Sequence, residues 1–322
     1  MTAITNFGWL VKREYWESRR GFLWAQFWAA AAILIITVLG IIAGEVLKAR
    51  MGAQVDVNMG VSLSQILRDA TTHDAGLAKA LDATMLLFAF VAAVVLTFVL
   101  FFYLLGALYD DRRDRSVLFW KSLPLSDTGT VLSKVAAGIV IAPLIAVGVV
   151  LAGYIGAQII VSLWVLGHGV NPLPLWAQGE PYGVWLRLLV MVPLNALWAL
   201  PTVGWLLAWS AAVRSKPFLW AIIVPIIAGL LNFWVGLLGI PHIRQDFFWG
   251  NIAGRLLLSV IPGSWIDPNS HGIRFRGAHE LAAIDYPAMG HALMLPQMWI
   301  GVIVGAALIA AAIWFRRWRD EA

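Results

Sequence analysis

Six long apolar segments, separated by stretches richer in polar residues, set the pattern of this chain of 322 residues. Each segment holds about 20 or more mostly apolar residues, the length that an α-helix needs to cross the hydrocarbon core of a bilayer. We therefore predict a single all-α polytopic membrane domain over residues 1–322, with six transmembrane helices. The predicted spans lie near residues 22–44, 84–108, 135–167, 184–213, 218–240 and 297–315.

Basic residues between these segments predict the orientation, because cytoplasmic loops carry an excess of Lys and Arg. With the N-terminus placed inside, 14 of the 23 Lys and Arg residues fall in the inner segments, which are the shorter ones. The turn at 214–217 and the C-terminal Arg316, Arg317 and Arg319 are the clearest indications. We predict a multi-pass protein of the cell inner (cytoplasmic) membrane with both termini in the cytoplasm.

The composition agrees with a membrane protein, because 61% of the residues are hydrophobic and only 13% are charged. Soluble proteins carry roughly 25% charged residues. The 18 Trp residues, many of them near the ends of apolar segments, are typical of interfacial anchors. Because the chain has no Cys, disulfides and thiolate metal sites are excluded. Orientation in the lipid bilayer explains the net charge of +5, so we expect no nucleic-acid partner.

Two segments outside the spans have the composition of membrane-associated helices. Residues 6–20 mix aromatic and basic side chains, as a helix lying in the plane of the inner interface does, although a plain positive-inside anchor has the same residues. The outer segment 241–296 contains the apolar stretch 252–261, which Arg255 interrupts and which is too short to span. We predict a re-entrant or interfacial helix there, acting either as a gate or as a binding cap. The candidate residues of the in-plane helix are Trp9, Lys12, Arg13, Tyr15 and Trp16.

Ionisable residues inside a membrane usually mark ion or proton pathways, and the cores of the six predicted spans contain none. The strongly polar side chains at depth are Gln158, Asn195 and Asn232. They are either polar groups along a transport pathway or partners in hydrogen bonds between helices. A transporter driven by protons or sodium needs carboxylates or broken helices near the midplane, so this pattern gives little support for ion coupling.

The chain also lacks the motifs of nucleotide-driven or hydrolytic chemistry. It has no phosphate-binding loop of the type G-x-x-x-x-G-K-[ST], no G-x-S-x-G elbow and no H-E-x-x-H helix. We therefore expect no catalytic residue in this chain and expect that energy for transport comes from another protein. The outer segment does gather His and carboxylate residues, which either are solvated or form a zinc-type site of a membrane-embedded enzyme. These residues are His242, His271, His279, His291, Asp246, Asp267, Glu280 and Asp285.

The most distinctive segment is the charged and aromatic stretch 109–134 between spans two and three, which the orientation places in the cytoplasm. Pro124 disfavours helix before it, and Ser126 or Asp127 then stands where an N-cap belongs. Aromatic side chains flanked by charges are typical of protein–protein anchors, although they can also rest on the inner leaflet. The candidate contact residues are Asp111, Arg112, Arg113, Asp114, Arg115, Phe119, Trp120, Lys121 and Pro124.

The run YDDRRDRSVLFWKSLPLS at residues 109–126, followed by Val131 and Lys134, resembles the loop between spans two and three of ABC-2 type permeases. The run KREYWE at residues 12–17 resembles the in-plane connecting helix of that family. Six spans, two inner termini and a long outer segment before span six are similar as well. The resemblance covers the whole architecture, whereas its specific motif is confined to the loop.

This resemblance implies a permease subunit without its own nucleotide site, paired with a separate ATPase that carries ATP and Mg²⁺. Such complexes typically contain two permeases, as a homodimer or heterodimer, and two ATPases. Residues 116–124 would be the coupling helix, and residues 252–261 would correspond to the family's outer re-entrant helices. Because the spans lack charges, we expect an amphipathic or lipid-like substrate moved outward. An accessory membrane scaffold that binds a different cytoplasmic complex is the main alternative.

Overall fold

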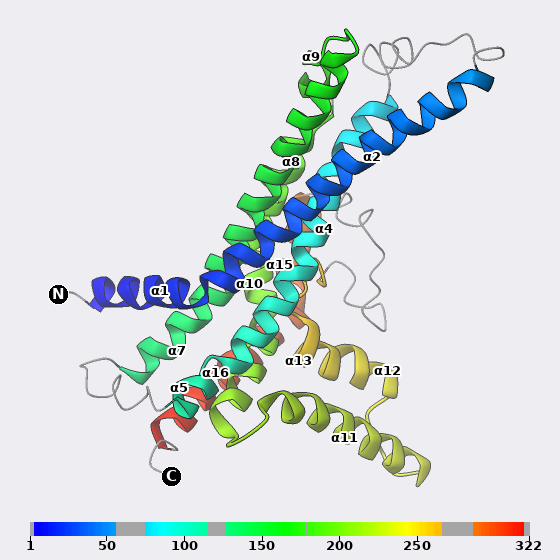
Figure 1. Cartoon of the computed structure of the whole chain (residues 1–322). Coiled ribbons are helices and arrows are strands. Elements are labelled where there is room, and N and C mark those ends of the chain that lie inside the picture. Colours follow the sequence, from blue (N-terminus) through cyan, green and yellow to red (C-terminus); the bar gives the residue numbers. More distant parts are fainter. Residues whose placement is uncertain (1–2, 56–74, 115–125, 178, 266–285, 319–322) are drawn as a thin grey trace.

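The computed structural model describes residues 3–55, 75–114, 126–177, 179–265 and 286–318. Throughout these ranges the regular elements are helices, with no strand among them, and six are long and apolar enough to be membrane spans (Figure 1). The prediction of an all-α protein with six spans is therefore confirmed. The six candidate spans are Phe7–Leu47, Ala78–Arg113, Asp127–Gly167, Leu173–Ala212, Pro217–Leu237 and Pro296–Trp318.

The helices within these spans are longer than the apolar runs, because helical hydrogen bonding does not stop where a bilayer ends. One long helix, α2, runs on to Val55, and α4 begins as early as Ala75. The α-helices are α1 (Ala3–Arg19), α2 (Gln26–Val55), α4 (Ala75–Gly106), α5 (Tyr109–Arg113), α7 (Asp127–Ala136), α8 (Ala142–Gly167), α9 (Leu173–Ala177), α10 (Pro181–Ala212), α11 (Pro217–Leu237), α12 (Gln245–Phe247), α13 (Gly254–Leu258), α15 (Tyr286–Met294) and α16 (Pro296–Trp318). Three π-helical segments, Arg20–Ala25, Ala137–Ile141 and Phe248–Ala253, join some of them.

The bundle is held together most closely where α10 meets α16. A Cβ atom added at Gly204 would lie 2.6 Å from the carbonyl oxygen of Gly305, and one added at Gly305 would lie 2.5 Å from the backbone of Leu200. Gly301 and Gly305 are spaced four residues apart on one face of α16. Small residues at this spacing allow close backbone approach in membrane helices, so these glycines set the distance between α10 and α16.

Two of the π-helical segments lie within the first and third candidate spans, in the N-terminal half of each. Residues 20–25 connect α1, which runs across the bundle, to α2, which runs along it (Figure 1). Residues 137–141 connect α7 to α8, which continue one another within the single helical span Asp127–Gly167. Phe22 in the first segment is fully buried, and its ring centroid lies 4.8 Å from that of Tyr103 on α4. These π-segments are therefore packed joints, a type of irregularity that often marks functional positions.

The predicted re-entrant segment is helical but divided. A short turn after α11, fastened by two hydrogen bonds between Asn232 and the backbone of Ile243, returns the chain toward the bundle. The segment then forms α12, the π-helix 248–253 and α13, which packs against α10. Gly263 ends it with a φ of +82°, a conformation that favours glycine. The prediction is thus confirmed for a helical segment between spans five and six.

One end of the bundle gathers α1, α5, α7 and the C-terminal part of α16 (Figure 1). We call it the inner end, since the basic residues predict that it faces the cytoplasm. The first and the last described helix, α1 and α16, both reach this end, as an even number of spans requires. On the periphery, α2 and α11 leave most of their apolar side chains exposed, which suits helices that face lipid.

Candidate functional site

A group of five buried or nearly buried charges joins four helices at the inner end. We call Glu14, Asp111, Asp127, Lys134 and Arg316 the inner ion-pair network. The Lys134 ammonium lies 3.1 Å from the Glu14 carboxylate and 3.4 Å from that of Asp111. The Arg316 guanidinium lies 3.4 Å from Asp111 and 3.1 Å from Asp127. Because α1, α5, α7 and α16 each contribute, the network ties the in-plane helix, the loop after span two and the last span into one unit.

Further polar groups complete the surroundings of Glu14, whose side chain is only 1% exposed. Arg13 pairs with Oε1 of Glu14 at 2.6 Å. The Tyr103 hydroxyl donates at 3.2 Å to Oε2, the oxygen that also pairs with Lys134, and lies 3.4 Å from the Lys134 carbonyl oxygen. A buried carboxylate needs both an opposite charge and hydrogen bonds, and Glu14 has both. Tyr103 thereby connects the network to Phe22 and so to the first π-segment.

Arg112 points inward and holds the end of α10. Its guanidinium donates to the carbonyl oxygens of Ser210 and Val213, the latter at 3.1 Å. The Ser210 hydroxyl accepts hydrogen bonds from the backbone N–H groups of Leu108 and Tyr109, both at 3.0 Å. The last carbonyls of a helix lack intrahelical partners, and a cation placed there also interacts favourably with the helix dipole. Arg112 therefore fixes the junction of α4 and α5 against the inner end of α10.

The remaining candidate contact residues of the loop divide into two groups. Arg113 and Asp114 are exposed, with 60% and 62% of their side chains accessible, and pair with each other at 3.2 Å. Arg115, Phe119, Trp120, Lys121 and Pro124 lie outside the described residues. At the start of α7, the Ser126 side chain accepts a hydrogen bond from the Gly129 backbone N–H at 3.0 Å and caps the helix, so the predicted N-cap is confirmed.

The N-terminal helix α1 has one face toward the bundle and one away from it. Leu10 and Glu14 are buried, whereas Trp9, Lys12 and Trp16 are exposed. The Lys12 ammonium lies 4.8 Å from the centre of the Trp9 ring, and Tyr15 packs edge-on against Trp16 at 5.9 Å. Exposed Trp beside basic groups is the arrangement that an interfacial helix needs, which supports the predicted in-plane position.

The three polar side chains of the spans each have partners within the chain. Gln158 donates to the Tyr154 hydroxyl at 2.6 Å and to the Leu175 carbonyl at 3.1 Å. Asn195 accepts the Trp265 indole N–H at 2.8 Å, and Asn232 fastens the turn after α11. These hydrogen bonds give each side-chain amide a structural role within the chain. A role in a transport pathway stays a prediction.

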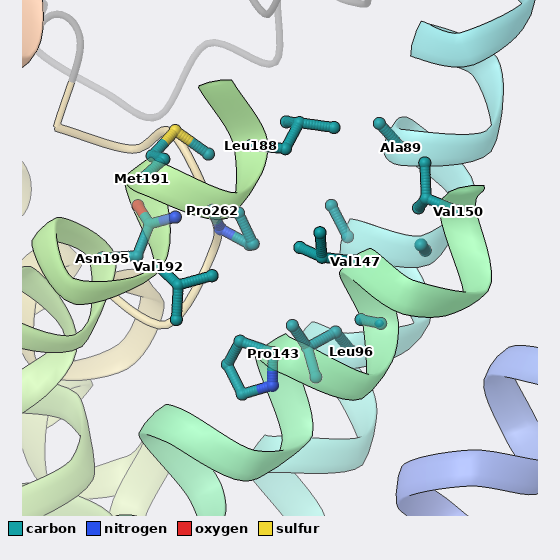
Figure 2. Close-up of a pocket in the computed structure, with 13 residues that line it drawn as sticks. Ala89, Leu96, Pro143, Val147, Val150, Leu188, Met191, Val192, Asn195 and Pro262 are labelled. Atoms are coloured by element: carbon teal, nitrogen blue, oxygen red, sulfur yellow. The ribbon is translucent and has the colours of Figure 1, made fainter. Parts of the chain in front are cut away.

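An apolar pocket lies between α4, α8 and α10 (Figure 2). Ala89 and Leu96 line it from α4, Pro143 and Val150 from α8, and Asn195 supplies a polar group at its edge from α10. Such a pocket has the character of a site for a hydrocarbon chain, since apolar walls with few polar groups suit apolar ligands.

The enzyme alternative rested on the outer His and carboxylate residues. Among the described residues, no group of three or more His, Cys, Asp or Glu is placed to hold a metal ion. His242 and His291 are exposed, and Asp246 pairs with Arg244 at 3.7 Å. His271, His279, Asp267, Glu280 and Asp285 lie outside the described residues.

Apart from Asp111, sequence reasoning missed the pairing of the network residues, namely Glu14, Asp127, Lys134 and Arg316, and it also missed the Tyr103 hydroxyl beside Glu14. One local signal was present: Lys134 lies between Val131 and Val135 on the apolar face of α7, where a lysine needs a carboxylate. Its partner Glu14 shares a face of α1 with Leu10. The partners themselves stand far away in the sequence, so the pairing follows only from the fold.

No protein-family model, curated protein or solved structure matches this chain. The chain is therefore identified as a helical multi-span membrane protein by its own six apolar helices.

Proposed function

We propose that this chain is the permease subunit of an ATP-binding-cassette exporter of the ABC-2 type, driven by a separate ATPase. The observation that supports this proposal best is the inner ion-pair network, because it binds the start of the 109–134 loop to α1, α7 and α16. A loop that receives force from a partner must be fixed to the elements that it moves. Here the fixation consists of buried ion pairs rather than of solvated surface contacts.

From the network, two routes lead into the membrane. Through Glu14 and α1, motion reaches the π-segment 20–25 and then α2. Through Lys134 and α7, it reaches the π-segment 137–141 and then α8. Because both routes pass a packed π-helical joint, rotation of the inner unit would tilt α2 and α8 together. We propose that ATP-driven closure of the ATPase dimer is transmitted to the spans in this way.

The apolar pocket between α4, α8 and α10 supports an amphipathic or lipid-like substrate. It borders α8, which the second route would move, so inner motion and pocket shape are linked through one helix. Transport would run outward across the inner membrane, with two permeases and two ATPases in the complex and with ATP and Mg²⁺ bound to the ATPases.

Affinity purification of the tagged chain from its native membrane, followed by mass spectrometry and an ATPase assay, tests this proposal. We expect an ATPase of the ATP-binding-cassette class to be retained in about equal amount. Arg113→Glu and Trp120→Ala should release it or uncouple its hydrolysis. Arg317→Glu, the same charge change at an exposed inner residue outside the loop, is the control and should not. Retention of a complex without such an ATPase would instead support the scaffold alternative.

A further inference from the structure

One strong charge lies deep in the bundle although the six spans carry none at their cores. Arg255 belongs to α13, and its carbonyl oxygen accepts the Thr202 hydroxyl of α10 at 2.8 Å. From Thr202 to the inner end of α10 at Ala212, the helix rises about 15 Å at 1.5 Å per residue. The side chain points from there toward the outer side, because its guanidinium lies on Trp198, about 21 Å from Ala212 by the same rise, and beside Gly301, about 7.5 Å from the start of α16. The segment between α11 and α16 thus places a cation between α10 and α16, in the outer half of the bundle.

The backbone around Arg255 is fixed by three hydrogen bonds. Thr202 is fully buried, and its hydroxyl also accepts the Ser259 amide at 2.9 Å. The Ser259 hydroxyl donates to the Arg255 carbonyl at 2.8 Å. Because this turn of α13 is bound to α10, the position of the Arg255 side chain is set by the fold rather than by a mobile loop.

The guanidinium lies between an aromatic ring and a glycine. Its central carbon is 3.5 Å from the centre of the Trp198 ring on α10, a close cation–π contact. On the other side, a Cβ atom at Gly301 of α16 would collide with Nη2, so only glycine leaves room for the guanidinium. Two helices therefore form a slot that fits this one side chain.

The hydrogen-bonding groups of this guanidinium are mostly unused. Nη1 donates to the Gln297 carbonyl at a long 3.4 Å, while Nε and Nη2 are shielded from solvent and have no hydrogen-bond partner. Within the described residues, Arg255 forms no ion pair with a carboxylate. Nε and Nη2 stand on one edge of the planar group, and that edge matches two oxygens of a carboxylate or phosphate.

An arginine remains charged in proteins, and a charge that is shielded from solvent without a charged partner is unfavourable. We propose that Arg255, held against Trp198, binds the anionic group of an amphiphile, a phosphate or a carboxylate, through its Nε–Nη2 edge. The apolar part of such a ligand has a place nearby, because Asn195 at the edge of the apolar pocket is one turn of α10 from Trp198. Binding is independent of the ATPase; only the interpretation of the ligand as cargo rests on the proposed function.

Ligand binding to the purified chain in a nonionic detergent, followed by native mass spectrometry, tests the proposal. The probes are dioctanoyl phosphatidic acid, decanoate, dioctanoyl phosphatidylcholine and inorganic phosphate. We expect the two anionic amphiphiles to bind and phosphatidylcholine to bind far more weakly. Arg255→Met should reduce the affinity of the anionic amphiphiles roughly ten- to hundredfold, as expected for the loss of charge-assisted hydrogen bonds. Arg187→Met, which removes a half-buried arginine from the outer part of α10, is the matched control and should bind as the unchanged chain does.

A second variant and a stability measurement separate ligand binding from misfolding. Gly301→Ala keeps the charge but displaces the guanidinium, so anionic amphiphiles should again bind more weakly. Without ligand, Arg255→Met should have a raised Tm, because it removes an unpaired charge. Equal affinity in Arg255→Met and Arg187→Met, or a lowered Tm of ligand-free Arg255→Met, would overturn the proposal. If inorganic phosphate binds tightly and the anionic amphiphiles do not, the proposed amphiphile ligand is wrong and the site binds a free anion.

Discussion

The charged side chains of the inner ion-pair network and of Arg255 are both largely shielded from solvent, but they differ in the partners of those charges. In the network, Lys134 and Arg316 each contact two carboxylates, so positive and negative groups alternate from α1 to α16. Arg255 is shielded as well, yet it has a ring and a carbonyl group where the network has carboxylates. A charge that is satisfied within the chain serves cohesion, whereas one left unsatisfied is available to something outside the chain.

The two groups of charges also lie at different heights along the bundle. The network lies at the inner end, where it connects α5 to α1 and α7, which lead to the π-segments before α2 and α8. The Arg255 guanidinium lies in the outer half of the bundle, on a segment that contacts α10 and lies against α16. If the chain is a permease, the inner ion-pair network receives the energy from the ATPase and Arg255 holds the ligand. The predictions that follow test whether the two kinds of charge behave as differently as their partners imply.

The largest effect is expected from Lys134→Met. This change leaves the Glu14 and Asp111 carboxylates close together without their shared cation, and removal of one member of a buried pair typically lowers stability by about 3–5 kcal/mol. Denaturant or thermal unfolding of the chain in micelles measures it. The double variant Glu14→Gln, Lys134→Met should lose less than the sum of the two single changes, since the two groups share one interaction. Additive losses would show that Lys134 is not held by Glu14.

Arg255→Met should change stability in the opposite direction. In the absence of ligand we expect a gain of about 1–3 kcal/mol, because a shielded, unpaired charge between two helices is replaced by an apolar side chain of similar length. The same unfolding measurement applies, with Arg187→Met as the control. If Arg255→Met and Lys134→Met both lower stability by similar amounts, then the contrast between the two regions does not hold.

The contrast also explains how much the sequence could predict. The six spans follow from local composition, because length and apolarity alone decide whether a helix can cross a bilayer. The N-cap at Ser126 follows from local chemistry too. The position of Arg255 between α10 and α16 could not be predicted, because a mostly apolar stretch of ten residues does not reveal which helices it packs against. The pairing of Glu14 with Lys134 joins residues 120 positions apart and required the tertiary structure.

A smaller difference is expected between the neighbouring arginines 112 and 113, which have the same chemistry but opposite surroundings. Arg112→Met removes the donors that hold the carbonyl groups at the end of α10 and should cost about 1–3 kcal/mol. Arg113→Met breaks only exposed pairs with Asp110 and Asp114, which are worth about 0–1 kcal/mol and are screened by salt. Unfolding at low and high ionic strength measures both effects.

We expect the loss of stability in Arg112→Met to persist at high salt and that in Arg113→Met to vanish. An equal, salt-sensitive loss in both would mean that Arg112 also faces solvent. If Arg112 instead behaves as its bonds to α10 imply, a coupling test must change Arg113 and leave Arg112 in place.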